Sequence, residues 1–175
     1  MNTFAVEIWN DELGRCTFYS VRWIDAQDNE TDEFFNTYDA LPKFEEATAE
    51  LLSLIEDVIG DTYGAIDDFF NRPENEVYGL PPQGVVKLRE VMIGYPNFPL
   101  RLYALKITNE IVVLFNGGIK DGATNQTSSL LSKWREACAF AKVILNHINE
   151  DYIIVDEDIW ELRLYNGTKE ILLEI

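Results

Sequence analysis

Two runs of β-branched and aromatic residues, separated by only three residues, constrain the fold of this chain most strongly. The runs cover residues 100–107 and 111–116, and Thr108-Asn109-Glu110 connects them. A connection this short joins antiparallel neighbours, because parallel strands need a crossover of about a dozen residues or more. Residues 85–92 have a similar composition. The sequence therefore predicts an antiparallel meander of three strands over these segments.

The N-terminal part of the chain predicts a hairpin followed by helices. Residues 3–9 and 16–24 are rich in strand-forming residues and flank a turn-rich segment, which is typical of a β-hairpin. The stretch 25–39 is polar and acidic. Apolar residues then recur at helical spacing, which predicts a helix over 42–59 that stops near Gly60. A short amphipathic helix is predicted over 63–71.

The C-terminal part predicts one long helix and a second hairpin. Thr127 or Ser128 can cap a helix whose broad apolar stripe runs through 130–148, as expected for a helix laid across a sheet. Asn166-Gly167 is a strong hairpin signal and predicts that residues 159–165 and 168–175 pair with each other.

These elements together indicate the α+β class. No low-complexity linker divides the 175 residues, of which 47% are hydrophobic. We therefore expect a single domain over 1–175, in which N-terminal helices and one C-terminal helix pack on the antiparallel meander. Neither a signal peptide nor a run of about 18 apolar residues is found, so we expect a cytoplasmic protein without a membrane partner.

Several kinds of chemistry are disfavoured by the residues that the chain lacks. Cys16 and Cys138 are too few for a disulfide framework and are expected to be reduced thiols. His147 is the only histidine, and we expect it near a helix end and not in a triad. The acidic runs 67–68 and 156–158 have no converging His or Asn partner, so we expect neither a metal nor a cofactor.

The charge is unevenly distributed along the chain. The formal net charge of −17 would repel nucleic acid over roughly a Debye length. However, residues 81–148 carry eight basic and four acidic residues, against four and nineteen in 1–80 and two and eight in 149–175. We call 81–148 the basic segment. Either it exposes a cationic face, or its cations form ion pairs with the acidic ends.

Four cations of the basic segment are the candidate site residues. Lys87 and Arg89 are two apart on one predicted strand and so share a face, where a partner strand could bring Arg101 alongside. Lys120 follows the next strand. A cluster of this kind could hold phosphate oxygens and stabilise the charge that develops during phosphodiester cleavage.

Over about residues 42–148 the order of elements resembles the RelE/HigB-like toxin superfamily. The motifs that carry the resemblance are Val86-Lys87-Leu88-Arg89, Leu100-Arg101-Leu102-Tyr103-Ala104, Ile111-Val112-Val113-Leu114-Phe115 and Gly118-Ile119-Lys120. Members are small mRNA endonucleases, ribosome-dependent or free, that are paired with antitoxins. The resemblance implies a RelE-like core at 42–148, with extra acidic hairpins in 1–41 and 149–175.

The same resemblance implies roles for the four cations. Arg101 and Lys120 would be catalytic, stabilising charge while a ribose 2′-hydroxyl attacks the neighbouring phosphate without a metal. Lys87 and Arg89 would bind RNA. The implied partners are an antitoxin protein and an mRNA or the ribosome. Because the acidic tail 149–175 has the opposite charge, it could also cover the basic segment in cis.

A second function remains open from the sequence. Residues 122–129 contain no Tyr or His that could act as a general acid or base, and the protein is strongly acidic. The alternative is a non-catalytic acidic interaction module that keeps a toxin-like scaffold and binds a protein partner. Exposed tryptophan or tyrosine beside acid is the chemistry expected of its binding surface, and Trp9, Trp23 and Trp160 lie on the predicted hairpins.

Overall fold

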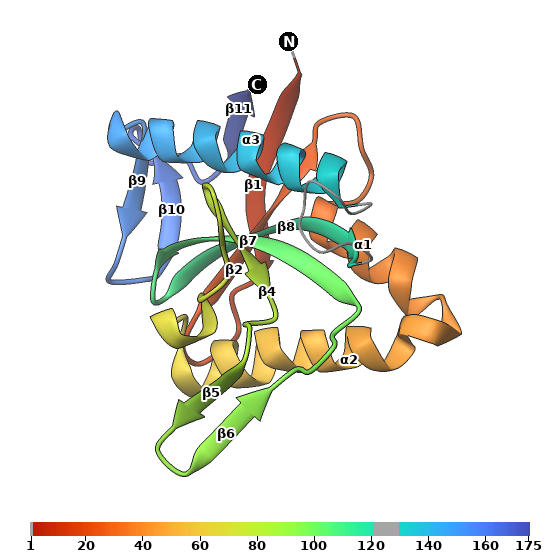
Figure 1. Cartoon of the computed structure of the whole chain (residues 1–175). Coiled ribbons are helices and arrows are strands. Elements are labelled where there is room, and N and C mark those ends of the chain that lie inside the picture. The colour runs from red at the N-terminus through yellow and green to blue at the C-terminus, as the bar shows by residue number, and fades with distance from the viewer. Residues whose placement is uncertain (1, 121–129) are drawn as a thin grey trace.

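A computed structural model of the chain, which describes residues 2–120 and 130–175, has an α+β fold built around a mixed sheet. The sheet has seven strands in the order β11-β1-β2-β8-β7-β4-β3. These strands are β1 (Thr3–Asn10), β2 (Thr17–Trp23), β3 (Pro73–Glu74), β4 (Val77–Leu80), β7 (Leu100–Thr108), β8 (Ile111–Ile119) and β11 (Ile171–Glu174). The helix α2 (Glu45–Ser53) lies on one side of the sheet, and α3 (Leu131–Asn149) lies across the other (Figure 1).

Two of the predicted strand pairs are confirmed. β1 and β2 form an antiparallel hairpin, and β7 and β8 are antiparallel across the short connection. β2 and β8 pair in parallel and join these two units into one sheet. Side chains alternate along β7, so that Leu100 and Leu102 contact the core on the α2 side, whereas Tyr103 and Leu105 contact the core on the α3 side.

The predicted first strand of the meander is wrong. Residues 85–92 form a separate hairpin of β5 (Val85–Leu88) and β6 (Val91–Gly94). The chain reverses at Arg89, whose φ of 57° lies in the left-handed region and ends the extended run. β4 takes the place beside β7 instead, so the antiparallel meander consists of β4, β7 and β8.

The predicted C-terminal hairpin is also wrong in its pairing. The turn at Asn166-Gly167 forms, with Gly167 at a φ of 88° and its N–H donating to Leu164 O over 2.9 Å. After this turn, however, β11 pairs with β1, while β10 (Glu161–Leu164) pairs with β9 (Ile153–Asp156). Ile171 and Leu173 of β11 are buried in the core on the α3 side, so the burial of apolar side chains overrides the local hairpin signal.

The polar stretch 25–39 contains a helix that its composition did not predict. α1 (Glu30–Asp39) begins after the cap residue Asn29, whose Oδ1 accepts a hydrogen bond of 2.8 Å from the N–H of Asp32. Phe34 is buried against the sheet, while several other residues of α1 face solvent. One buried aromatic face is therefore enough to fix a helix of otherwise polar sequence.

The remaining helices follow the prediction with changed ends. The predicted helix at 42–59 consists of the 3₁₀ turn η1 (Pro42–Phe44), α2, and π-helical turns η2 (Leu54–Tyr63), and it ends at Gly64, where φ is 79°. The short helix predicted over 63–71 is reduced to the 3₁₀ turn η3 (Asp67–Phe69). α3 confirms the long C-terminal helix, whose predicted cap at Thr127 or Ser128 lies outside the described residues.

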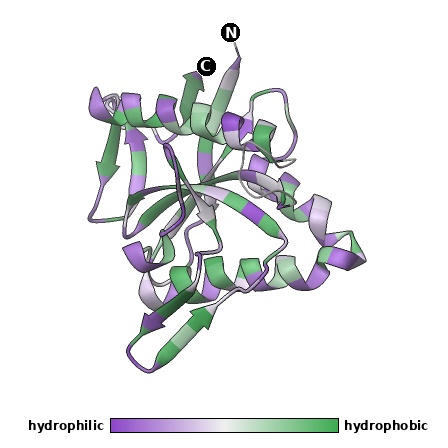
Figure 2. Ribbon diagram, viewed as in Figure 1, coloured by the Kyte–Doolittle hydropathy of each residue, from purple (hydrophilic) through white to green (hydrophobic). Residues whose placement is uncertain are grey.

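The hydrophobic core has one layer on each side of the sheet. On the α3 side, Phe140 stacks on Phe115 and contacts Phe4 and Trp23, with ring centroids 4.8–6.0 Å apart. Figure 2 shows apolar and polar residues alternating along α2 and α3, as expected for helices that cover a sheet with one face. In the described part of the chain, no helix is both long and apolar enough to cross a membrane.

Candidate functional site

Arg101, predicted to be catalytic, lies in the interior of the protein. It is on β7 with only 8% of its surface exposed, and its Nη1 donates to Leu100 O over 2.9 Å and to Phe98 O over 3.3 Å. Burial, followed by the charge of Arg72, lowers the pKa of Arg101 to about 10. Backbone carbonyls therefore satisfy part of this guanidinium, as expected for a buried charge.

The structure separates the four predicted site residues into two groups. Lys120 follows β8, and its backbone N–H donates to Pro99 O over 2.7 Å, which places it beside the start of β7 and near Arg101 in the pairing. Lys87 and Arg89 are exposed on the β5–β6 hairpin, which projects from the sheet on the α2 side (Figure 1). Strand pairing therefore does not bring Arg101 alongside Lys87 and Arg89.

Lys87 and Arg89 line a shallow hollow of their own. Its other lining residues are Tyr63, Leu88, Glu90 and Val91. The hollow thus combines two cations and one acidic side chain of the exposed hairpin with the aromatic ring of Tyr63 from η2.

Two cations of the basic segment pair with acidic residues from other parts of the chain. Lys106 on β7 forms an ion pair with Asp67, and Lys133 on α3 lies 4.0 Å from Glu33 of α1. The hydrogen bond from Lys106, with its charge, lowers the pKa of Asp67. The charge pattern left two arrangements open, an exposed cationic face or ion pairs with the acidic ends. Lys106 and Lys133 follow the second arrangement.

The final strand of the acidic tail does not pair with the strand that carries Arg101. β11 pairs with β1, and three strands separate β11 from β7 in the sheet. Arg163 of the tail forms an ion pair with Asp156, and Lys169 with Glu161, so the tail also pairs internally. The strand order therefore argues against a cover formed by this final strand.

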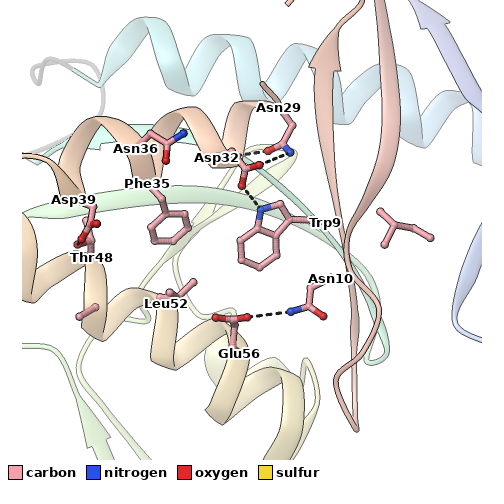
Figure 3. A pocket seen from close by; sticks show the side chains of 12 residues that line it. Trp9, Asn10, Asn29, Asp32, Phe35, Asn36, Asp39, Thr48, Leu52 and Glu56 are labelled. Carbon is pink, nitrogen blue, oxygen red and sulfur yellow. Dashed lines mark hydrogen bonds between the residues drawn. The ribbon is translucent and has the colours of Figure 1, made fainter. Parts of the chain in front are cut away.

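The groove with the most organised polar lining lies elsewhere, between the end of β1 and the helices α1 and α2 (Figure 3). Its volume is about 610 Å³. The lining residues come from three elements and the α1 cap, and they are Ile8, Trp9, Asn10, Asn29, Asp32, Phe35, Asn36, Asp39, Thr48, Ala49, Leu52 and Glu56. We call this the acidic groove. The residues of α1 and of the α2–η2 helix recur every three or four positions, so each helix presents one face to it.

Local irregularity in β1 directs Trp9 into the acidic groove. Ile8 pairs with Tyr19 and Asn10 with Phe18, so Trp9 is the extra residue of a β-bulge. A bulge of this kind bends a strand and redirects a side chain. The indole reaches α1, where Nε1 donates to Asp32 Oδ1 over 2.9 Å.

The cap of α1 fixes the carboxylate of Asp32. Asn29 Nδ2 donates to Asp32 Oδ2 over 3.0 Å, while Trp9 holds Oδ1. Trp9 also stacks on Phe35, with ring centroids 6.2 Å apart and an angle of 25° between the ring planes. The acidic groove thus contains an aromatic surface with a fixed carboxylate at its edge (Figure 3).

Two more carboxylates stand around this aromatic surface. Glu56 Oε2 accepts a hydrogen bond of 3.0 Å from Asn10, and Asp39 Oδ1 accepts one of 3.2 Å from Thr48. No described Lys or Arg lies within ion-pair distance of Asp32, Asp39 or Glu56, and the described lining contains neither residue type. Three unneutralised carboxylates in one groove create a negative potential that favours a cationic ligand.

Sequence reasoning identified Trp9 but not its neighbours in the acidic groove. Asp32 and Phe35 lie on the unpredicted α1, and Glu56 lies within the predicted helix 42–59 but was not identified as a candidate. The signal that could have found α1 is Asn29, an N-cap residue type followed three positions later by an acid. Trp23, by contrast, packs against Phe140 and is part of the core periphery.

The other groups with reactive side chains are structural in their contacts. Both cysteines are free, and burial raises the pKa of Cys16 to about 12 and that of Cys138 to about 11. His147 lies in the last turn of α3 with its Nδ1 2.7 Å from Val143 O, as expected. Tyr103 is 1% exposed, and burial raises its pKa. Each raised pKa favours the neutral, less nucleophilic form.

Comparison of the chain with models of protein families, with curated proteins and with solved structures finds no match.

Proposed function

We propose that this protein is a non-catalytic interaction protein whose acidic groove binds a basic segment of a protein partner. The observation that carries the proposal is the combination of Asp32, Asp39 and Glu56 with the half-buried Trp9, without a described cation to neutralise them. A basic ligand would gain favourable charge interactions here that a neutral or acidic ligand would not.

The groove also has the composition expected of a binding surface. Tryptophan is enriched among the residues that dominate binding energy, and Trp9 stands at the centre of the lining with Phe35 beside it (Figure 3). The acidic groove has a volume of about 610 Å³, which can hold several side chains of a partner. The net charge of −17 would also steer a basic partner toward the protein before contact.

A RelE/HigB-like ribonuclease, with mRNA as substrate and an antitoxin as partner, is the second candidate function. One observation favours it: Arg101 and Arg72 lie together, since a Cβ on Gly79 would be 2.8 Å from Arg72 Cδ and 3.7 Å from Arg101 Cδ. No described carboxylate is within ion-pair distance of either guanidinium. An anionic phosphate would relieve the repulsion between the two.

The interaction function ranks first because the parts of the ribonuclease site are dispersed. Arg101 is buried, while Lys87 and Arg89 lie on a hairpin that does not pair with its strand. The acidic groove, in contrast, gathers its polar and aromatic side chains on one accessible surface. Affinity requires such a set of groups in one place.

A binding assay with a matched charge control tests the proposal. The probe is a fluorescein-labelled peptide in which basic residues alternate with glycine, and its dissociation constant is measured by fluorescence anisotropy. The double variant Asp32→Asn/Glu56→Gln should bind at least about tenfold more weakly, because two carboxylates of the groove are lost. The control Glu157→Gln/Asp158→Asn, at exposed positions, changes the net charge equally and should bind within about twofold of the wild type.

Three results would count against the interaction function. Absence of binding would contradict it directly, and equal weakening in both double variants would show that net charge alone attracts the peptide. Cleavage of RNA by the purified protein that is lost in Arg101→Ala/Lys120→Ala would favour the ribonuclease instead.

A further inference from the structure

The acidic groove contains two partly exposed aromatic rings whose planes are nearly parallel. Trp9 and Phe35 come from different elements, yet their ring planes are inclined by only 25°. Both side chains are half-buried, so part of each ring faces the groove. The buried Phe18 packs against the indole nearly at a right angle, with ring centroids 6.3 Å apart, and so helps to hold Trp9 in place. The structure thus presents a supported platform for a flat group.

The carboxylate of Asp32 has a fixed place at the edge of this platform. The indole N–H of Trp9 lies in the plane of the ring and donates to Oδ1 over 2.9 Å, so the carboxylate stands beside the ring and not over its face. Asn29 restrains the second oxygen over 3.0 Å. Each oxygen keeps lone-pair capacity for a further donor, because a carboxylate accepts about four hydrogen bonds in all.

Glu56 provides a second carboxylate from the opposite wall. It lies in the helical turns that follow α2, and Asn10 at the end of β1 donates to its Oε2. Figure 3 shows Glu56 below the indole and Asp32 above it, with the ring between them. A cation on the ring face would therefore be flanked by negative charge from two helices.

We propose that the acidic groove recognises an arginine side chain of the partner, with its guanidinium on the Trp9–Phe35 platform and its N–H groups directed to Asp32 and Glu56. This inference rests on the proposed function and names the residue that the groove selects. A guanidinium is planar, stacks on aromatic faces and donates within its own plane, so it can use the platform and the carboxylates together. A lysine ammonium is a compact, strongly hydrated point charge and lacks the stacking surface.

Two labelled peptides of equal length and charge test the selection. In one, glycine alternates with arginine, and in the other with lysine. The wild type should bind the arginine peptide about tenfold more tightly, equivalent to about 1.4 kcal/mol. Trp9→Leu should abolish this ratio, whereas Trp9→Phe, which keeps an aromatic face, should retain part of it. Circular dichroism and thermal melting establish that each variant is folded.

A second variant keeps the test decisive if Trp9→Leu does not fold. Asp32→Asn keeps an oxygen acceptor for the indole N–H but loses the charge, and it should lower affinity for the arginine peptide more than for the lysine peptide. Equal wild-type affinities for both peptides, still weakened in the groove double variant, would overturn arginine selection and leave the proposed function standing. If the protein binds neither peptide, both arginine selection and the proposed function are overturned.

Discussion

The buried carboxyl of Glu30 gives the sharpest stability prediction. Glu30 is the first residue of α1 and is 3% exposed, and the groups that affect its carboxyl most directly are Glu136 of α3 and Asn116 of β8. Its Oε1 has no hydrogen-bond partner within the described structure. Burial, and then the hydrogen bond and charge of Glu136, raise the pKa of Glu30 from 4.5 to about 7. The folded protein therefore holds this proton more tightly than the unfolded chain does.

The sign and size of the effect follow from proton linkage. Because the folded pKa is the higher one, the stabilising contribution of the proton is complete below pH 4.5 and is lost as the pH rises through about 7. A rise from 4.5 to about 7 corresponds to about 3 kcal/mol. Glu30→Gln is neutral at every pH and escapes this loss. It should therefore exceed the wild type in unfolding free energy by up to about 3 kcal/mol at pH 8.

Urea denaturation followed by tryptophan fluorescence, at intervals from about pH 5 to pH 8, measures this difference. The control is Glu46→Gln, which removes one charge at an exposed position of α2 and should track the wild type at every pH. If the difference in unfolding free energy between Glu30→Gln and the wild type stays constant with pH, proton linkage at Glu30 is refuted. A Glu30→Gln protein less stable than the wild type at pH 8 would refute it as well.

Three further substitutions test other contacts by the same denaturation assay. Tyr19→Phe removes the hydroxyl that accepts the N–H of Leu162 over 2.8 Å, and it should cost about 1–3 kcal/mol; an unchanged stability would show that this N–H finds another partner. Gly117→Ala places a Cβ 1.8 Å from Arg101 O and should cost more than about 1 kcal/mol, which a tolerated substitution would contradict. Gly94→Ala, whose Cβ would lie 3.4 Å from the nearest atom, should stay within about 0.5 kcal/mol of the wild type; a larger loss would remove its value as a control.

Sequence patterns predicted two of the strand pairs that depend on local connections. The hairpin β1–β2 and the pair β7–β8 each follow from strand-forming runs with a turn between them. The pairing of β11 with β1 did not follow, because it joins the two ends of the chain. The reversal at Arg89 depends on a left-handed backbone conformation, which an arginine in the sequence does not indicate.

The candidate site shows the same division between local and non-local information. The charge pattern identified the basic segment, but it could not show that Arg101 is buried or that Lys106 pairs with Asp67. Trp9 was recognised as a candidate for binding, whereas its partner Asp32 lies 23 residues further along the chain. The acidic groove could not be predicted because three elements build it, and α1 was hidden in a polar stretch.

Binding of arginine in the acidic groove is tested most directly by following the NMR signal of the Trp9 indole N–H while the arginine peptide is added. The four tryptophans give separate side-chain signals in a ¹H–¹⁵N correlation spectrum, and Trp9→Phe identifies the signal of Trp9. If the peptide binds in the acidic groove, the chemical shift of the Trp9 signal should change until the protein is saturated with peptide, while the signals of Trp23, Trp134 and Trp160 should not move. A Trp9 signal that does not move while the peptide binds would contradict binding in the acidic groove.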